Sequence, residues 1–280
     1  MTAPARRSPL RELRSGGAPA AAPLLGAGGH EDAGSHEPGT GSVSGWDLST
    51  GVDGPGTRFV LFTAGCPLRC QYCHNPETWR MRDGHVVHAR EVVAEVARYA
   101  TFIGAAGGGV TVSGGEPLLQ PAFVREVMAG VRAQGLHTAL DTAGSVRITP
   151  AVEALLDEVD LVLLDVKAGS PERFAEVSGG RLERTLDFGR LLAARGQRTW
   201  VRFVLVPGLT DDAETIGEVA GACADMGCVE RVDVLPYHRL GEHKYAELGI
   251  DYPLAGTPPP APAAVAAAVD VFREAGLAAS

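Results

Sequence analysis

Two kinds of apolar segment alternate along the chain from about residue 58 onward. Short runs rich in valine, leucine and phenylalanine are typical of buried parallel strands, whereas longer segments repeat their apolar residues at helical spacing. The short runs predict six strands, at residues 58–63, 109–112, 136–140, 161–166, 199–206 and 231–235.

The longer segments predict a helix after almost every strand. In the first helix, Val92, Val93, Val96 and Tyr99 recur at helical intervals. A later helix begins at Pro150, where the missing N–H of proline costs nothing. The predicted helices are 88–100, 121–133, 150–158, 182–194, one capped by Asp211 or Asp212 that runs to about 226, and 263–275.

Strand and helix alternate six times, and this alternation predicts the α/β fold class. Alternation of this kind indicates a parallel sheet with helices on the outside. Right-handed crossovers between the strands would curl such a sheet. Six units fall short of the eight in a closed barrel, so we expect an incomplete (β/α)6 barrel.

The first 42 residues have a different composition, rich in alanine, glycine, proline and serine. This composition predicts a disordered N-terminal tail at 1–42, followed by one domain at 43–280. Four arginines near the start, within residues 6–14, make a targeting peptide the alternative. Pro19, Pro23 and Gly26 interrupt the apolar core that a secretory signal needs. We assign this tail no function.

Composition limits the classes of function. The chain has 280 residues, 45% of them hydrophobic, which is enough for a sizeable core. Its net charge of -9 argues against a nucleic-acid partner. No apolar run reaches the length of about 18 residues that a membrane helix needs. The 5 cysteines are too few for a disulfide framework and indicate a reducing compartment, so we expect a cytoplasmic protein.

Three of those cysteines, Cys66, Cys70 and Cys73, share one short loop. Three thiolates can hold a four-iron cluster while leaving one iron without a protein ligand, open to another molecule. The alternative is a zinc site with a distant fourth ligand. Cys223 and Cys228 form the only other pair, and we interpret them as small buried side chains.

Polar motifs follow the predicted strands at their carboxyl ends. Parallel α/β folds build active sites at that edge, so these motifs are expected to meet there. They are the cysteine loop after the first strand, Gly114-Gly115-Glu116 after the second, Asp141-Thr142 after the third, Asp165 and Lys167 at the fourth, and His238 after the sixth.

Several motifs together resemble those of a known family. The run Gly-Pro-Gly-Thr-Arg-Phe at 54–59, followed by Cys66-x3-Cys70-x-Tyr72-Cys73-x-Asn75, is similar to the signature of radical SAM enzymes that activate glycyl-radical enzymes. The resemblance extends from about Gly51 to the C-terminal helix. Further matches are Ser113-Gly114-Gly115-Glu116, Leu140-Asp141-Thr142, Leu164-Asp165-Val166-Lys167 and Leu235-Pro236-Tyr237-His238.

The resemblance implies an activity and its cofactors. One [4Fe–4S] cluster on Cys66, Cys70 and Cys73 would bind S-adenosylmethionine (SAM) at its open iron, and reductive cleavage of SAM would yield a radical that takes hydrogen from a glycine of a partner protein. The implied partner is a glycyl-radical enzyme of the pyruvate formate-lyase kind. The implied electron donor is a flavodoxin or ferredoxin, and the implied oligomeric state is a monomer. Since no cysteine-rich insert is present, we expect one cluster only.

The resemblance also implies which residues contact SAM: Tyr72, Cys73, His74, Gly114, Gly115, Glu116, Asp165, Val166, Lys167 and His238. The two glycines would let the backbone approach SAM closely, and a carboxylate can hold its ammonium. A monovalent cation at Asp141 is implied as well. Asp141 and Asp165 could instead cap helices, and His238 could be a core histidine. Arg202 could be structural or could pair with the cofactor or substrate.

Two other functions stay open on the sequence alone. The first is a radical SAM activase with another target, such as anaerobic ribonucleotide reductase. The second is a non-catalytic zinc-binding module. The iron and sulfide content of the protein separates the zinc module from the others, and activation assays separate the possible targets.

Overall fold

The computed structural model describes residues 37–280 and contains one mixed sheet. Its strands lie in the order β3-β1-β2-β4-β5-β6-β7-β8. Six neighbouring strands, β2, β4, β5, β6, β7 and β8, are parallel to one another. This confirms the six parallel strands predicted from the sequence. The strands are β1 (Thr40–Thr50), β2 (Thr57–Thr63), β3 (His85–His88), β4 (Gly109–Gly114), β5 (His137–Thr142), β6 (Leu161–Asp165), β7 (Thr199–Leu205) and β8 (Val229–Pro236).

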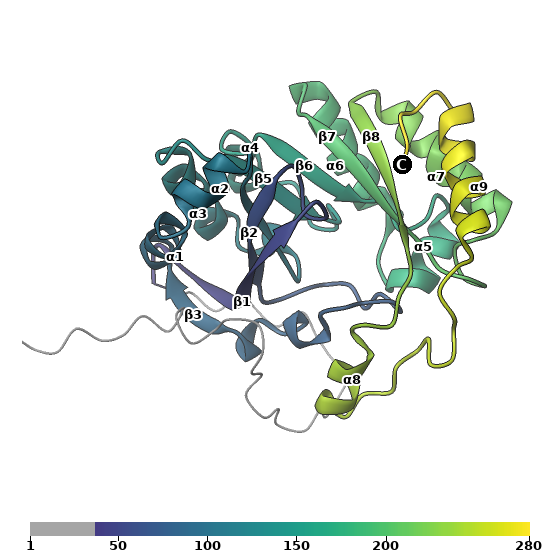
Figure 1. Cartoon of the computed structure of the whole chain (residues 1–280), viewed down its shortest axis with the longest axis horizontal. Coiled ribbons are helices and arrows are strands. Elements are labelled where there is room, and N and C mark those ends of the chain that lie inside the picture. Colours follow the sequence, from purple (N-terminus) through teal and green to yellow (C-terminus); the bar gives the residue numbers. More distant parts are fainter. Residues whose placement is uncertain (1–36) are drawn as a thin grey trace, which may run out of the picture.

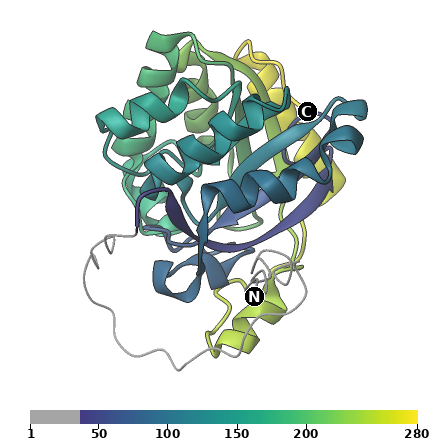
Figure 2. The same ribbon diagram turned by 90° about the vertical axis from the view of Figure 1, so that its left-hand side faces the viewer.

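Helices cover the outer face of the curved sheet (Figure 1). Figure 2 shows them from the side, lying over the strands. The helices are α1 (Ala89–Ala97), α2 (Ala100–Ala105), α3 (Pro121–Arg132), α4 (Pro150–Leu156), α5 (Pro171–Ser178), α6 (Leu182–Arg195), α7 (Ala213–Met226), α8 (Glu242–Leu248) and α9 (Pro262–Glu274). The sheet does not close, so the incomplete α/β barrel expected from six units is confirmed.

The main core lies between the sheet and these helices. Val110, Leu140 and Val162 from neighbouring parallel strands are fully buried there, and Phe188 of α6 packs into the same cluster. Apolar runs in the strands form this core because both faces of a parallel sheet are covered. No helix in residues 37–280 is long and apolar enough to span a membrane.

The amino-terminal strand β1 was not predicted, and the boundary expected after residue 42 falls inside it. Ser42 is buried, and its N–H donates to the Gln120 side chain at 2.6 Å. The pattern of β1 is rich in glycine, serine and threonine, so its burial comes from pairing with β2 and β3 in the tertiary structure. The predicted disorder of residues 1–36 lies outside the described residues.

Three further segments correct the predictions. The helix expected at 88–100 begins one residue later and ends at Ala97, and a separate α2 begins at Ala100. His88 ends strand β3 and is the N-cap of α1, where its N–H donates to the Glu91 carboxylate at 3.1 Å. Helices α5 and α8 were not predicted. Both are short, and a segment of seven or eight residues carries little helical periodicity.

Candidate functional site

The cysteine loop follows β2 and is held in shape by its own backbone. The Gly65 N–H donates to the Thr78 carbonyl at 2.7 Å, and the Cys66 N–H donates to the Trp79 carbonyl at 3.1 Å. Gly65 has a φ of 97°, a conformation that favours glycine. These bonds close the two ends of the loop on each other, so the three cysteines stay on one compact segment.

The middle of the loop is fixed to the end of α5. The N–H groups of Arg69 and Gln71 donate to the carbonyls of Ser178 and Val177 at 2.7 and 2.9 Å. The Arg69 guanidinium also donates to the Cys66 carbonyl at 2.8 Å. Helix α5, which was not predicted from the sequence, therefore supports the loop on both sides of the second cysteine, Cys70.

The three thiols are free, and their surroundings favour the neutral form. Burial raises the pKa of the Cys66 thiol and of the Cys73 thiol, and it raises the pKa of Cys70 to about 11, although Lys167 opposes the shift at Cys70. Thiols that ionise with difficulty on their own become thiolates when a metal replaces the proton. A donor set of three thiols on one preformed loop fits an iron–sulfur cluster with one open iron.

No group of three or more His, Cys, Asp or Glu side chains within residues 37–280 is arranged to hold a metal ion. This finding concerns side chains that converge on one ion. A four-iron cluster places each of three thiolates on a different iron atom.

The Gly-Gly-Glu segment at the end of β4 packs directly on the cysteine loop. The Glu116 N–H donates to the Gly65 carbonyl at 2.7 Å. A Cβ atom at Gly115 would lie 2.2 Å from that same carbonyl oxygen, so only glycine fits there. The two motifs that the sequence placed after neighbouring strands are thus joined by backbone contact.

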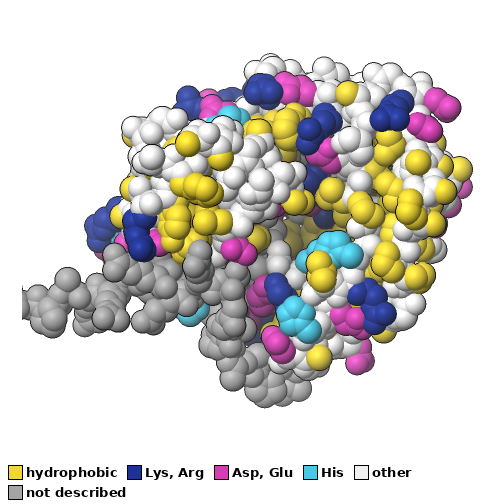
Figure 3. Space-filling model, viewed as in Figure 1, with side chains coloured by type: hydrophobic (Ala, Val, Ile, Leu, Met, Phe, Trp, Pro, Cys, Tyr) yellow, Lys and Arg dark blue, Asp and Glu magenta, His cyan; other side chains and the backbone are white. Residues whose placement is uncertain are grey.

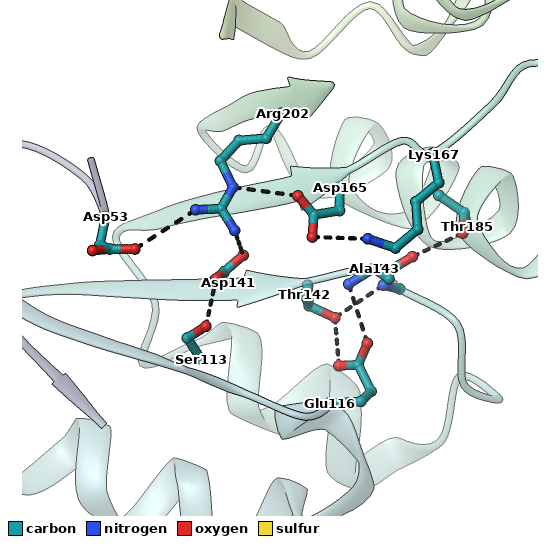
Figure 4. Close-up of polar contacts among 11 residues, drawn as sticks. Asp53, Ser113, Glu116, Asp141, Thr142, Ala143, Asp165, Lys167, Thr185 and Arg202 are labelled. Carbon is teal, nitrogen blue, oxygen red and sulfur yellow. Dashed lines mark hydrogen bonds and ion pairs between the residues drawn. The ribbon is translucent and has the colours of Figure 1, made fainter. Parts of the chain in front are cut away.

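The Glu116 side chain is buried and points away from solvent toward the end of β5 (Figure 4). Its carboxylate accepts from the Thr142 hydroxyl at 2.5 Å and from the Ala143 and Leu118 N–H groups, both at 3.1 Å. Burial raises its pKa to about 7, although these three donors favour the ionised form. The three donors already engage both oxygens, so in this structure Glu116 links β4 to β5.

Arg202 of β7 forms the centre of a second polar cluster (Figure 4). Its guanidinium donates to Asp141 and lies 3.3 Å from the Asp165 carboxylate and 3.7 Å from that of Asp53. The other Asp141 oxygen accepts from the Ser113 hydroxyl at 2.5 Å. One cation therefore faces three carboxylates in the interior of the barrel.

The two strand-end aspartates differ in their electrostatics. Burial raises the pKa of Asp141 to about 6, and the negative charge of Asp165 adds to this rise, although Arg202 opposes it. Burial acts in the same direction on Asp165, but Lys167 and Arg202 outweigh it and lower its pKa. Asp165 thus has two cationic partners, whereas Asp141 has one.

Lys167 connects this cluster to the cysteine loop. Its ammonium lies 3.1 Å from the Asp165 carboxylate and 5.7 Å from the centre of the Tyr72 ring, within cation–π range. The Val166 side chain between them is buried in the hydrophobic core, so only its main chain faces the site.

His238 meets the cysteine loop from the opposite side of the barrel opening. Its ring stacks on that of His74 with the centroids 4.1 Å apart, and the His74 Nε2 lies 3.0 Å from the His238 carbonyl. Figure 3 shows histidine side chains beside a hollow in the middle of this face. Most of the predicted site residues therefore lie on the cysteine loop or contact it. Asp165 is linked to the loop through Lys167, whereas Asp141 and the Val166 side chain do not contact it.

The comparisons with known proteins agree with this geometry. The sequence pattern of the Radical SAM superfamily matches residues 60–219. The pyruvate formate-lyase 1-activating enzyme of Escherichia coli K12 is 44% identical over 210 residues, which are 75% of this chain and 85% of that protein. The pyruvate formate-lyase-activating enzyme of Staphylococcus epidermidis is 44% identical over 215 residues, 75% of this chain and 86% of that protein.

The chain belongs to the radical SAM superfamily and to its pyruvate formate-lyase-activating enzymes. A crystal structure of a domain of such an enzyme from Bacteroides vulgatus superposes with a TM-score of 0.52 at 25% identity, covering 62% of this chain and 98% of that domain. As a radical SAM enzyme, the chain uses a [4Fe–4S] cluster and SAM. As an activating enzyme, it acts on a glycyl-radical enzyme.

The sequence analysis missed part of the site. Asp53 was not among the candidates, Ser113 was quoted only as part of a matched motif, and Arg202 was left between a structural and a binding role. The signal for Arg202 was its charge inside an otherwise apolar strand. Lys244 and Tyr245, which contact the cysteine loop from α8, gave no signal because nothing in the local sequence ties them to it.

Proposed function

We propose that this protein activates pyruvate formate-lyase by generating a glycyl radical on it. The observation that carries the proposal is the direct contact between the cysteine loop and the Gly-Gly-Glu segment, where the Gly65 carbonyl accepts from the Glu116 N–H. This contact puts three thiols and a glycine-rich backbone at one edge of the sheet, where a cluster and SAM can lie together.

Cys66, Cys70 and Cys73 would hold the cluster, and the remaining iron would be open to the amino-acid end of SAM. When bound and reduced, the cluster would supply the electron for the reductive cleavage of SAM, the chemistry from which the glycyl radical on the partner would come. The protein's own part is to hold these groups in a dry, fixed arrangement.

The surrounding residues are assigned by their position. Gly114 and Gly115 place backbone without side chains beside the loop, while Asp165 and Lys167 offer a carboxylate and an ammonium next to Tyr72. His74 and His238 would contact the cofactor from the far side of the barrel opening, while Val166 would contribute only main-chain atoms. Glu116 would act by joining β4 to β5, since its oxygens already have three donors.

A monovalent cation beside Asp141 stays a proposal, and Arg202 bears on it. The Asp141 oxygens already contact Arg202 and Ser113, so a bound cation would have to share this carboxylate with the guanidinium.

Finer properties complete the proposal. A flavodoxin or ferredoxin would deliver the electron, and the protein would act as a monomer without nucleic acid or membrane. The 5 free cysteines support a cytoplasmic location, because thiols stay reduced there.

The test is a complete activation assay under anaerobic conditions. With reductant, SAM and pyruvate formate-lyase, the protein should release 5′-deoxyadenosine and produce a glycyl radical signal in electron paramagnetic resonance. Replacing Cys66, Cys70 or Cys73 by Ala should abolish both products. Cys223→Ala is the matched control, because Cys223 is fully buried in the helix layer and should leave the iron content unchanged.

The assay distinguishes the alternatives. Deoxyadenosine without a glycyl radical on pyruvate formate-lyase would retain the cofactor chemistry and point to another glycyl-radical enzyme, such as anaerobic ribonucleotide reductase. Zinc in place of iron and sulfide after anaerobic purification would contradict the proposed function.

A further inference from the structure

The segment that follows β8 returns to the cysteine loop and ends in helix α8. In Figure 1 this helix lies apart from the other helices, below the curved sheet. Its residues contact the half of the loop that carries the third cysteine. Around Cys70 the loop has a different support, the bonds from the Arg69 and Gln71 N–H groups to the end of α5.

Tyr245 makes the closest of these contacts to a cysteine. Its hydroxyl donates to the Cys73 carbonyl at 3.1 Å, and its ring is 1% exposed. The ring also meets the Trp79 indole edge-on, with centroids 5.8 Å apart. The Trp79 carbonyl in turn accepts from the Cys66 N–H at 3.1 Å.

Lys244 adds a charged contact two to four residues beyond Cys73. Its ammonium donates to the Asn75 side-chain oxygen at 2.9 Å and to the Glu77 carboxylate at 2.6 Å. Both partners belong to the turn that leads from Cys73 to Trp79. Lys244 and Glu77 are each less than one third exposed, so solvent weakens the pair only in part.

The start of α8 also lies very close to the loop backbone. A Cβ atom at Gly241 would lie 2.9 Å from the Cα atom of His74, so glycine permits this approach. Together with the stacked rings of His74 and His238, this contact extends the interface along residues 73–79.

We propose that α8 is a clamp that positions Cys73 as a ligand of the cluster, with Tyr245 and Lys244 as its positioning residues. The inference rests on the proposed function, since it takes Cys73 as a cluster ligand. Hydrogen bonds around a metal ligand fix its orientation, and losing one weakens metal retention. The bonds from the loop backbone to α5 end at Gln71, and the Cys73 N–H donates to the Cys70 carbonyl at 3.1 Å in a local turn.

Tyr245→Phe tests the clamp, because it deletes the hydroxyl and keeps the ring. Tyr252→Phe is the matched control. It deletes the hydroxyl that pairs with the Tyr237 hydroxyl at 2.8 Å, and its ring packs against Tyr245 without a bond to the loop. In cluster-free protein, amide hydrogen exchange over residues 73–79 should become about tenfold faster in Tyr245→Phe, the factor expected for one lost buried hydrogen bond. Tyr252→Phe should leave exchange there unchanged.

The same pair of variants gives a readout on the cluster itself. After anaerobic reconstitution, a chelator should remove iron about tenfold faster from Tyr245→Phe than from Tyr252→Phe, at similar melting temperatures of the two variants. Lys244→Met should behave in the same way, and Lys244→Arg should restore retention by keeping the charge near Glu77.

The outcomes are separable. If Tyr245→Phe and Tyr252→Phe match in exchange and in iron release, the clamp is overturned while the proposed function stands. If the wild type takes up no iron at all, the proposed function falls, and the assignment of α8 to a cluster ligand falls with it.

Discussion

Two arginines lie in the same sheet, Arg58 near the amino end of β2 and Arg202 in β7 beside the carboxyl end of β6. Arg58 is 0% exposed and its hydrogen-bond partners are neutral, whereas the side chain of Arg202 is 11% exposed. Arg58 donates to the Thr111 hydroxyl at 2.9 Å and to the Val110 carbonyl at 2.5 Å, and it lies 3.2 Å from the His137 ring nitrogen. Burial lowers the pKa of Arg58 to about 10, with Asp53 opposing the shift.

Arg202 has the opposite surroundings. Burial disfavours its charge, but Asp141, Asp165 and Asp53 outweigh this effect and raise its pKa above the ordinary value. The comparison shows that burying a charge does not by itself mark a functional site. At the amino ends of the parallel strands, neutral groups accept the hydrogen bonds of Arg58, and we interpret this arrangement as structural. The Arg202 end concentrates charges of both signs beside the cysteine loop, as expected where a charged ligand is to be held.

The largest effect expected from this comparison is the loss of the Arg202 charge. Arg202→Met would leave three interior carboxylates without their shared cation, so the free energy of unfolding should fall by about 3–5 kcal/mol. Arg58→Met should cost about 1–3 kcal/mol, because it leaves neutral acceptors unpaired. Urea unfolding of the two variants measures the difference. If the two variants lose the same free energy of unfolding, the surroundings of Arg58 and Arg202 do not differ as described.

The next effect is a pH dependence of opposite sign at the two ends. The raised pKa of Glu116 means that the folded protein prefers its neutral form, so its contribution falls as pH rises from about 4.5 to about 7, by about 3 kcal/mol in total. Burial and the charge of Arg58 lower the pKa of His137, so its contribution is lost as pH falls below about 6.5.

Unfolding free energies at pH 5 and pH 8 measure both effects. Glu116→Gln should remove a decrease in stability toward pH 8, and His137→Gln should remove a decrease toward pH 5. The difference between each variant and the wild type isolates the one group from other titrations. If the unfolding free energy of a variant depends on pH as that of the wild type does, the substituted residue, Glu116 or His137, is not the group that causes the dependence.

A smaller effect is expected at Asp53, which lies between the two arginines. Its carboxylate is 23% exposed and 3.7 Å from Arg202. Asp53→Asn should therefore lower the free energy of unfolding by only about 1 kcal/mol, whereas Asp141→Asn should cost more. If Asp53→Asn proves as costly as Asp141→Asn in urea unfolding, the expected difference between these two carboxylates as partners of Arg202 is wrong.

The smallest effect is expected from removing residues 1–36, whose composition predicts no core of their own. The free energy of unfolding should stay within about 0.5 kcal/mol of that of the full chain, and the rate of deoxyadenosine formation should stay within about twofold. Removal of residues 1–42 is the sharper comparison, because it also deletes Ser42 and its buried bonds to Gln120 and Met81. Equal behaviour of the two truncated proteins would show that the start of β1 contributes nothing.

The sequence by itself determined the six parallel strands and the edge at which the chemistry gathers. Both follow from local information. The periodicity of a few residues predicts a strand or a helix, and a motif such as Cys66-x3-Cys70-x2-Cys73 contains all of its metal ligands. The errors in the predicted strands and helices are mostly shifts of one or two residues at their ends, where capping and fraying decide.

The tertiary structure decided the rest. Strands β1 and β3 form because they pair with β2 and with each other, although their own pattern is weak. The role of Arg202 depends on Asp53, Asp141 and Asp165 from three other segments. Tyr245 reaches the Cys73 carbonyl across 172 positions of sequence. Interactions of this kind leave no periodic trace in the chain, because they arise only when distant segments are brought together by the folded sheet.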